Sequence, residues 1–531
     1  MEGSSKSSPL VGGASWMLVL PSVADLIFVA LLGTLLFTPL SSRLLGDADI
    51  GWHIRTGQQI LATHAIPHAD SFSSTMQGKP WFAWEWLYDV VAGWLEAHLG
   101  LNGVVWLTAV VIATVFAWVF RLLIVRGTNL LAALVLYLLA VCASTIHFLA
   151  RPHVLSWLFT LASFVVLDSS EREGLDSRRR RRTLWLLPLL MLVWVNVHGG
   201  FLVGFVLLGI FWLAAVWEWS RASAERIEEA VQRVAAGKTA RDLALVGVVS
   251  AVASLCNPYG WRLYAHAFSY LSNRFLMDHI DEFRSPDFHS LAPRIFVLLL
   301  LVTLTAVARG RRELRVSGLL TLLFAVYTGV YSARNIPVSS LLLVMIVGPL
   351  LRNAAPAGWR ERTLDRMAMR LQRLGEIESR LRVHLWPAAA ILLTLVVAAN
   401  GGSIGSVHVM DAHFDPKRMP VAAVDYLEKH ALNGPVLTPD YWGGYVIYRL
   451  YPKNLVVVDD RHDLYGEEFF KSYLKFDYAQ PGWDDFLRQH EAGCVLLPKD
   501  SPLNSVLPRN GWTVLYSDDV AMAYVPERSR R

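Results

Sequence analysis

Charge and cysteine are both scarce in this chain of 531 residues. Only 18% of the residues are charged and 54% are hydrophobic, whereas soluble domains average about 25% charged and 45–50% apolar residues. This composition excludes an ordinary soluble domain and favours a membrane protein. The three cysteines, Cys142, Cys256 and Cys494, are far apart, so the sequence predicts neither a disulfide framework nor a cysteine-ligated metal.

Several other signals are missing from the chain. No nucleotide-binding motif is present, which disfavours a nucleotide-sugar substrate. The net charge is +5, but the basic residues cluster between apolar segments rather than along one soluble face, so no nucleic-acid partner is expected. The first apolar segment is longer than a signal-peptide core and lacks a small-residue cleavage site, which indicates a transmembrane helix.

Long apolar segments dominate the first 401 residues. A transmembrane helix needs about 17–25 mostly apolar residues, and the sequence predicts about eleven such spans. We therefore expect a polytopic α-helical membrane protein. The predicted spans lie near residues 22–45, 101–124, 129–149, 153–168, 183–198, 200–219, 243–257, 292–308, 316–333, 337–351 and 385–401.

The basic residues orient this bundle. Cytoplasmic loops are enriched in arginine and lysine, and every second connection is basic. Because an odd number of spans separates the termini, the pattern predicts a cytoplasmic N-terminus and a C-terminus outside the cytoplasm. The basic connections contain Arg121 and Arg126; Arg172 and Arg178 to Arg182; Arg221 to Arg241; Arg309 to Arg315; and Arg352 to Arg382.

The apolar runs end at Asn400, and residues 402–531 resemble an α/β domain. Residues 421–430 (VAAVDYLEKH) have helical spacing, and short β-strands are predicted at LVVVDD (455–460), CVLLP (494–498), TVLYSD (513–518) and AMAYVP (521–526). The chain is thus expected to contain a transmembrane domain, residues 1–401, and an extracytoplasmic α/β domain, residues 402–531.

Unusual polar residues gather at the outer ends of the predicted spans. Polar groups at membrane depth are costly and usually face a cavity or a partner. The sequence therefore predicts a shared cavity at the outer membrane surface. The residues are Asp47 and Asp49; 147–153 (HFLARPH); 196–200 (NVHGG); 257–261 (NPYGW); and 333–335 (ARN).

The first outer loop, residues 46–100, is too polar to span a membrane. It has two helix-like stretches, Ile50 to Thr63 and Trp84 to Leu99, separated by a turn-rich segment with Pro67, Gly78 and Pro80. Its tryptophans favour the headgroup level of a bilayer. We expect two short helices that lie along the outer surface.

Three motifs resemble those of the GT-C superfamily of membrane glycosyltransferases. The loop sequence DIGWHIR (Asp49 to Arg55) is similar to the first-loop motif of oligosaccharyltransferase catalytic subunits, and Gly78-Lys79-Pro80 is similar to the turn of protein mannosyltransferases and of the lipid A aminoarabinose transferase. YWGGY (Tyr441 to Tyr445) is similar to the WWDYG signature of oligosaccharyltransferases, with glycine in place of the central aspartate.

The resemblance implies a GT-C-like bundle and an activity. Such an enzyme moves a sugar from a polyprenyl-phosphate-linked donor to an extracytoplasmic glycan, lipid or protein acceptor, here in a bacterial inner membrane. It also implies a divalent cofactor, Mg²⁺ or Mn²⁺, with Asp47 and Asp49 as candidate ligands. HFLARPH lacks the acidic pair of the second metal motif of oligosaccharyltransferases, so metal dependence stays open.

The chemistry requires a base or metal ligand and positive charge on the departing phosphate. Asp49 and then Asp47 are the candidates for the first role, although aspartate is also a preferred helix cap. The phosphate candidates are Arg55, Arg151, His153, His198 and Arg334, of which the arginines could equally anchor helix ends at headgroups. The acceptor or sugar candidates are His53, Glu85, Trp84, Tyr441, Trp442 and Tyr445.

Two further acidic segments leave alternatives open. Residues 278–283 (DHIDEF) could supply Asp281 or Glu282 to a metal or form a solvated loop, and residues 459–463 (DDRHD) could carry ligands or dock the C-terminal domain. A flippase for lipid-linked sugars and a noncatalytic envelope-assembly scaffold are the competing functions. The chain shows no internal repeat of the kind many transporters have.

Overall fold

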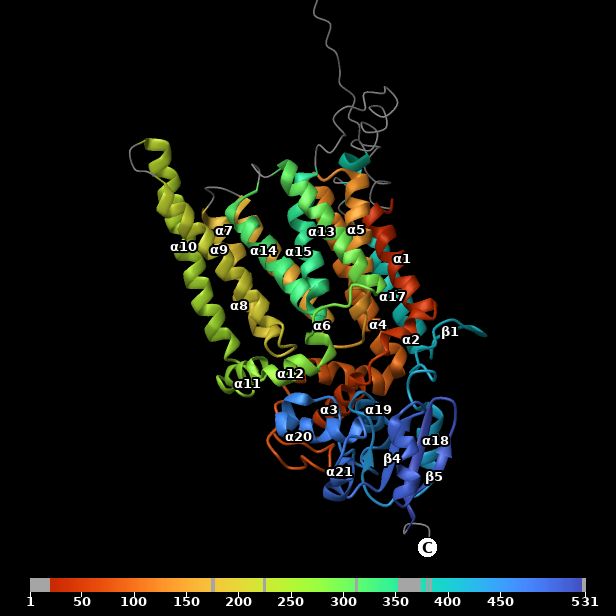
Figure 1. Ribbon diagram of the computed structural model, residues 1–531. Coiled ribbons are helices and arrows are strands. Elements are labelled where there is room, and N and C mark those ends of the chain that lie inside the picture. Colours follow the sequence, from red (N-terminus) through yellow and green to blue (C-terminus); the bar gives the residue numbers. More distant parts are fainter. Residues whose placement is uncertain are drawn as a thin grey trace, which may run out of the picture.

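The computed structural model describes residues 20–172, 177–222, 226–310, 314–351, 374–378, 381 and 384–527. A bundle of long helices forms one half of the molecule, and residues 402–527, called here the C-terminal region, pack against one end of it (Figure 1). Most of the basic segment 352–382 lies outside the described residues.

Each segment that the sequence predicts to span a membrane is largely helical. Among the described residues, six helices are long and apolar enough to cross a membrane, and α1, α14 and α17 are shorter apolar helices. The bundle consists of α1 (Val23–Phe37), α2 (Leu40–Leu44), α4 (Trp86–Val125), α5 (Leu130–Ser144), α6 (His153–Arg172), α7 (Ser177–Leu184), α8 (Leu186–Trp194), α9 (Phe201–Arg221), α10 (Ile227–Ser254), α13 (Leu291–Gly310), α14 (Val316–Tyr331), α15 (Ile336–Leu350) and α17 (Leu385–Ala399).

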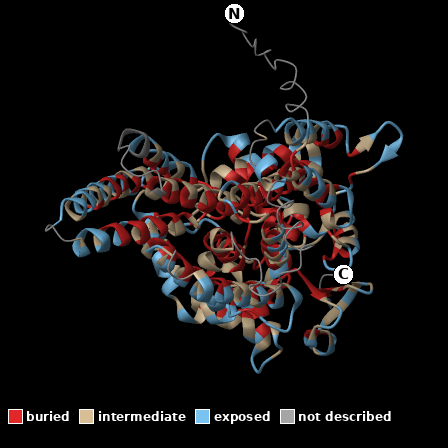
Figure 2. Ribbon diagram, turned by 90° about the horizontal axis from the view of Figure 1, so that it is seen from above, coloured by how far each residue is buried: buried red, intermediate tan, exposed pale blue. Residues whose placement is uncertain are grey.

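The centre of the bundle is formed by α15 and the second half of α4. Nearly every residue of α15 is buried, as expected for a helix that is apolar all round. The outer helices carry exposed apolar side chains, such as Val248 on α10 and Leu304 on α13, and the exposed residues follow the periphery of the bundle (Figure 2). This pattern suits a bundle surrounded by lipid.

The first loop begins with α3 (Asp49–Thr63), close to the predicted limits. The second predicted helix, Trp84 to Leu99, is not separate: it is the first part of α4, which runs on into the bundle through a break at Gly100. Gly100 has φ +63°, a left-handed backbone that glycine adopts without strain. The chain therefore turns from the surface into the bundle without a connecting loop.

Two glycines let α3 and α4 cross in backbone contact. A Cβ on Gly57 would lie 1.7 Å from the carbonyl oxygen of Asp89, and a Cβ on Gly93 would lie 2.6 Å from the amide nitrogen of Gln58. Only glycine fits at such a crossing. The close approach places Asp89 of α4 directly beside His53 of α3.

The C-terminal region contains a four-stranded mixed sheet in the order β3-β4-β6-β5. Three strand predictions are confirmed by β4 (Cys494–Pro498), β5 (Trp512–Ser517) and β6 (Ala521–Pro526), and the helix prediction by α18 (Val421–Lys429). The remaining elements are β1 (Ser403–Ile404), β2 (Val407–His408), β3 (Val436–Leu437), α19 (Asp440–Leu450), α20 (His462–Asp477) and α21 (Trp483–His490).

The prediction of a strand at residues 455–460 is wrong. This segment makes only isolated bridges, from Val456 to Val436 of the short β3 and to Ser73 of the first loop. The strand β3 is only two residues long and Ser73 belongs to a turn, so neither can form a continuous β-ladder with residues 455–460. The segment instead connects the first loop to the sheet.

The YWGGY motif docks the C-terminal region on the first loop. It lies in α19, where a Cβ on Gly444 would be 2.3 Å from the carbonyl oxygen of Ala48 and a Cβ on Gly443 would be 2.6 Å from the Cα of Asp459. The glycine pair thus allows α19 to touch the start of α3 on one side and the segment 455–460 on the other.

Candidate functional site

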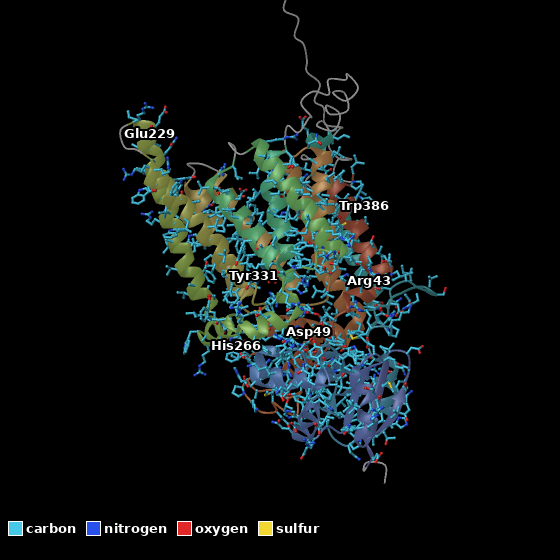
Figure 3. The ribbon with its side chains drawn as sticks, in the orientation of Figure 1. Arg43, Asp49, Glu229, His266, Tyr331 and Trp386 are labelled. Carbon is cyan, nitrogen blue, oxygen red and sulfur yellow. The ribbon has the colours of Figure 1, made fainter. Side chains whose placement is uncertain are left out.

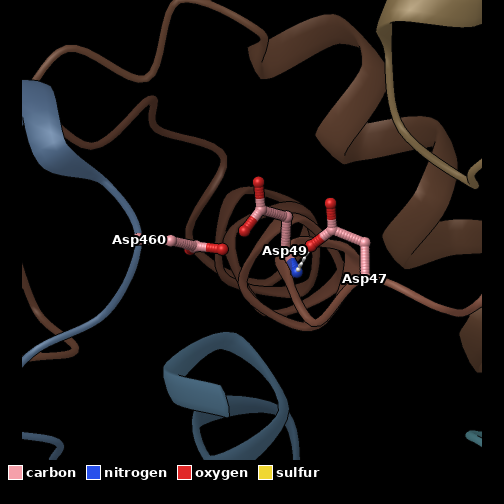
Figure 4. Close-up of side chains that lie close together, drawn as sticks. All are labelled: Asp47, Asp49 and Asp460. Carbon is pink, nitrogen blue, oxygen red and sulfur yellow. Dashed lines mark hydrogen bonds between the residues drawn. The ribbon is translucent and has the colours of Figure 1, made fainter. Parts of the chain in front are cut away.

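Three aspartates meet where the bundle and the C-terminal region join. Carboxylate oxygens of Asp47, Asp49 and Asp460 all lie within 4.8 Å of one another (Figure 4). Asp49 is the first residue of α3, and its backbone N–H donates to the Asp47 carboxylate at 3.1 Å. Asp460 comes from the segment that α19 holds in place. We call these residues the acidic triad.

The triad has the chemistry of a site for a hard cation. Asp49 is 4% exposed, and its Oδ1, like Oδ1 of Asp460, is buried without a hydrogen-bond partner. Burial, and then the charge of Asp47, raise the pKa of Asp460. Clustered carboxylates with free buried oxygens repel one another, and an oxygen-seeking divalent cation removes this cost. The residues present therefore fit a hard divalent cation.

Arg151 joins the triad to the rest of the site. Its guanidinium contacts the carboxylates of Asp47 at 2.8 Å, Asp49 at 2.5 Å and Glu282 at 3.6 Å. Although burial opposes the charged form, the carboxylates of Asp47 and Glu282 hold the pKa of Arg151 above its usual value. Arg151 directly precedes Pro152 and the start of α6, so it lies at the end of that helix.

A second arginine lies on the far side of Glu282. Arg334, in the 3₁₀ helix η5 (Ala333–Asn335), donates to Glu282 at 2.7 Å and lies over the ring of Phe283. Glu282 belongs to η3 (Asp281–Phe283). Burial raises the pKa of Glu282, but the charges of Arg334 and Arg151 outweigh this effect and lower its pKa to about 2. This glutamate is therefore an ionised bridge between two arginines.

Glu85 lies among buried histidines immediately before α4. Its two carboxylate oxygens are each 3.6 Å from a histidine Nε2, of His53 and of His198. Burial raises the pKa of Glu85 to about 8. Burial also lowers the pKa of both histidines, with the charge of Arg151 adding to the effect at His53 and that of Arg334 at His198.

These groups surround a cavity of about 1400 Å³. Its walls come from the first loop, the ends of the helices and the C-terminal region, and Asp49 marks this boundary in Figure 3. Of the residues predicted from the sequence, the cavity is lined by Asp47, Asp49, Trp84, Glu85, Arg151, Arg334, Tyr441 and Trp442.

The other predicted residues lie outside the lining of this cavity. Arg55 donates to the carbonyl oxygen of Tyr448, because six residues of helix carry it about 120° around α3 from Asp49. Tyr445 is 1% exposed and packs on Phe414 within the C-terminal region. His153 contacts the carbonyl oxygen of His147, and His53 and His198 lie directly behind Glu85.

Sequence reasoning left two residues of the site open and missed a third. Glu282 was a possible metal ligand or part of a solvated loop, and Asp460 belongs to a segment that could carry ligands or dock the C-terminal domain; both line the cavity. Asp89 carries no motif. Its only signal is indirect, since Gly57 and Gly93 allow a close helix crossing that brings Asp89 to His53.

Comparison with solved structures shows that the chain shares its fold with an archaeal oligosaccharyltransferase and with ArnT, the fold that the resemblance predicted. The fold and the six described helices that are long and apolar enough to cross a membrane are consistent with a multi-pass membrane protein. No family model matches the chain, and no curated protein matches it. The likeness is therefore one of structure, at low sequence identity.

Two solved proteins illustrate this likeness. The Archaeoglobus fulgidus oligosaccharyltransferase tethered to an acceptor peptide with the NVT sequon has a TM-score of 0.56 at 11% identity, covering 97% of this chain and 74% of that chain. Its apo form has a TM-score of 0.52. ArnT from Cupriavidus metallidurans, in the apo state, has a TM-score of 0.51 at 14% identity, covering 94% of this chain and 96% of that chain.

Proposed function

We propose that this protein is a glycosyltransferase that moves a sugar from a polyprenyl-phosphate-linked donor to an extracytoplasmic glycan, lipid or protein. The observation that carries the proposal is the acidic triad beside Arg151, in a large cavity at one end of an apolar bundle. The shared fold supports it, since the similar solved proteins are an oligosaccharyltransferase and ArnT.

The orientation follows from charge. Arg221 ends α9, and Arg233 and Lys238 lie in the first half of α10. Glu229, in the first turn of α10, lies at the end of the bundle far from the C-terminal region (Figure 3). Cytoplasmic loops are enriched in such residues. We place that end in the cytoplasm and the cavity, with the C-terminal region, on the outer side of a bacterial inner membrane.

Each part of the site has a role in this reaction. Asp47, Asp49 and Asp460 would hold a divalent cation, Mg²⁺ or Mn²⁺, which when bound neutralises the developing charge on the phosphate. Arg151 and Arg334 line the cavity and orient the phosphate of the donor through paired N–H groups. Trp84, Tyr441 and Trp442 also line it and offer ring faces to the sugars.

The first test is mass spectrometry of the lipids that co-purify with the wild type and with Asp49→Asn. Asp49 is buried within the triad, so its loss should stop turnover. We expect intact sugar-linked polyprenyl phosphate on the variant and free polyprenyl phosphate on the wild type. Asp411→Asn is the control, because that carboxylate is exposed and outside the cavity lining.

Two other outcomes contradict the proposal. Equal amounts of intact donor on the wild type and Asp49→Asn would favour a flippase, which binds the lipid without cleaving it. Absence of any polyprenyl lipid from both proteins would favour a scaffold, and deletion of the C-terminal region would then be the damaging change.

A further inference from the structure

Glu85 stands apart from the acidic triad within the same cavity. It is 9% exposed and lines the cavity. None of the described hydrogen bonds or ion pairs joins it to Asp47, Asp49 or Asp460; its close neighbours are His53 and His198. A cation at the triad therefore leaves this carboxylate without a metal role.

Behind Glu85, a buried histidine is held by a second carboxylate. Nδ1 of His53 is 2.6 Å from the Asp89 carboxylate, so Nδ1 carries the hydrogen and Nε2 presents its lone pair. Nε2 has no hydrogen-bond partner, and His53 is 0% exposed. This lone pair faces Glu85 at 3.6 Å. Asp89 thus fixes the orientation of the His53 imidazole behind Glu85.

A second buried histidine lies beside the opposite oxygen of Glu85. Nε2 of His198 is 3.6 Å from that oxygen. The same Nε2 accepts from the guanidinium of Arg334 at 3.1 Å, so the hydrogen of the neutral ring lies on Nδ1, beside Ser156 Oγ at 2.8 Å. Both histidines thus flank Glu85 at more than hydrogen-bond distance, and none of the described contacts gives its carboxylate oxygens a hydrogen-bond donor.

We propose that Glu85 is the general base of the transfer, with His53 and Asp89 as positioning residues behind it; this inference rests on the proposed function. The acceptor hydroxyl oxygen forms a bond to the anomeric carbon as the bond from that carbon to the phosphate oxygen breaks. The electron pair leaves with the phosphate, and the hydroxyl proton moves to Glu85. Asp49 then serves only as a metal ligand, together with Asp47 and Asp460.

The electrostatics of the pocket suit this role. Burial, which is the largest effect, raises the pKa of Glu85 to about 8, and a base works best when its pKa is near the working pH. The charged and titratable groups that face Glu85 come from every surrounding element: His53, Asp89, Arg151, His198, Glu282, Arg334 and Asp463.

Azide rescue separates a base from a metal ligand. Azide ion attacks the anomeric carbon without losing a proton, so it makes a base unnecessary but still needs the phosphate to be stabilised. The assay uses membranes that retain donor and acceptor, and it follows release of polyprenyl phosphate and formation of the glycosyl azide by mass spectrometry. Glu85→Ala should slow release about 100-fold or more, and sodium azide should restore it. Asp49→Asn should stay inactive with azide.

Glu96→Gln is the matched control, since Glu96 lies on α4 outside the cavity and contacts Gln58 and Tyr448. Should Glu85→Ala fail to fold, Asp89→Asn tests the same base assignment through the pH dependence of the rate. Loss of this negative neighbour favours ionisation of Glu85, so the midpoint of the rate against pH should move to lower pH. In Glu85→Gln, the rate should not show this rise with pH.

The outcomes separate the two proposals. Turnover by the wild type, with no azide rescue of Glu85→Ala and an unshifted midpoint for Asp89→Asn, would overturn the base assignment and leave the glycosyltransferase intact. No release of polyprenyl phosphate by the wild type under any condition would overturn both.

Discussion

Replacing Gly444 with alanine should loosen the C-terminal region and damage the site. The added Cβ would lie 2.3 Å from the carbonyl oxygen of Ala48, whereas close C···O contacts are about 3.3–3.6 Å. The clash is with backbone, so no side chain can swing aside and α19 must move about 1 Å away from α3. Such overpacking costs about 1–3 kcal/mol.

The displacement reaches the acidic triad. Gly443, the next residue, packs on Asp459, which precedes Asp460, so a shift of α19 carries Asp460 away from Asp47 and Asp49. A misplacement of about 1 Å can cost up to about 100-fold in rate. We expect a lower Tm, weaker Mn²⁺ binding and slower release of polyprenyl phosphate.

Thermal unfolding in detergent and Mn²⁺ titration measure this effect. The control is Gly209→Ala in α9, where a Cβ would meet no atom within 4 Å; alanine there should leave Tm unchanged or raise it, since glycine inside a helix costs about 0.5–1 kcal/mol. If Gly444→Ala had the Tm and Mn²⁺ affinity of the wild type, the docking role assigned to the glycine pair would be wrong.

Three further predictions follow from individual contacts. Asp460→Asn should weaken Mn²⁺ binding about 10–100-fold in titration, whereas Asp477→Asn, in the same cavity but outside the triad, should not. Arg461→Met strands the buried carboxylates of Asp70 and Asp459 and should cost about 3–5 kcal/mol of stability, seen as a lower Tm; an unchanged Tm would contradict a structural role for this arginine. The pKa of Glu85 is raised in the folded protein to about 8 from 4.5. The contribution of this group to folding stability is therefore complete below pH 4.5 and is lost as the pH rises to 8. Glu85→Gln should flatten the decline of Tm over that pH range.

Much of the architecture was predictable because it depends on local patterns. Apolar length located the helices of the bundle, helical spacing located α3 and α18, and alternation with β-branched residues located β4, β5 and β6. The segment 455–460 has the same composition but forms no strand, because the neighbours available to Val456 are too short to extend a ladder. Strand formation depends on a partner as well as on composition.

The site was predictable only in part. Asp47 and Asp49 are neighbours in sequence, and the break from apolar helix to acidic loop marks them directly. Arg55 follows in the same motif, yet helical rotation turns it toward Tyr448. His53 is one turn after Asp49 and lies on the same face of α3, a relation that the spacing already contains.

The sequence sufficed for the apolar helices, for α3 and for the acidic pair at its start, since each follows from the properties of adjacent residues. Asp460, Glu282 and Asp89 joined the site only through folding, because they lie hundreds or tens of residues from Asp49 and nothing local aims them at it. Their convergence depends on glycines at close crossings: Gly57 of α3, which touches α4, and Gly444 of α19, which touches the start of α3. Contacts of this kind are set by the packing of whole elements, which no short stretch of sequence encodes.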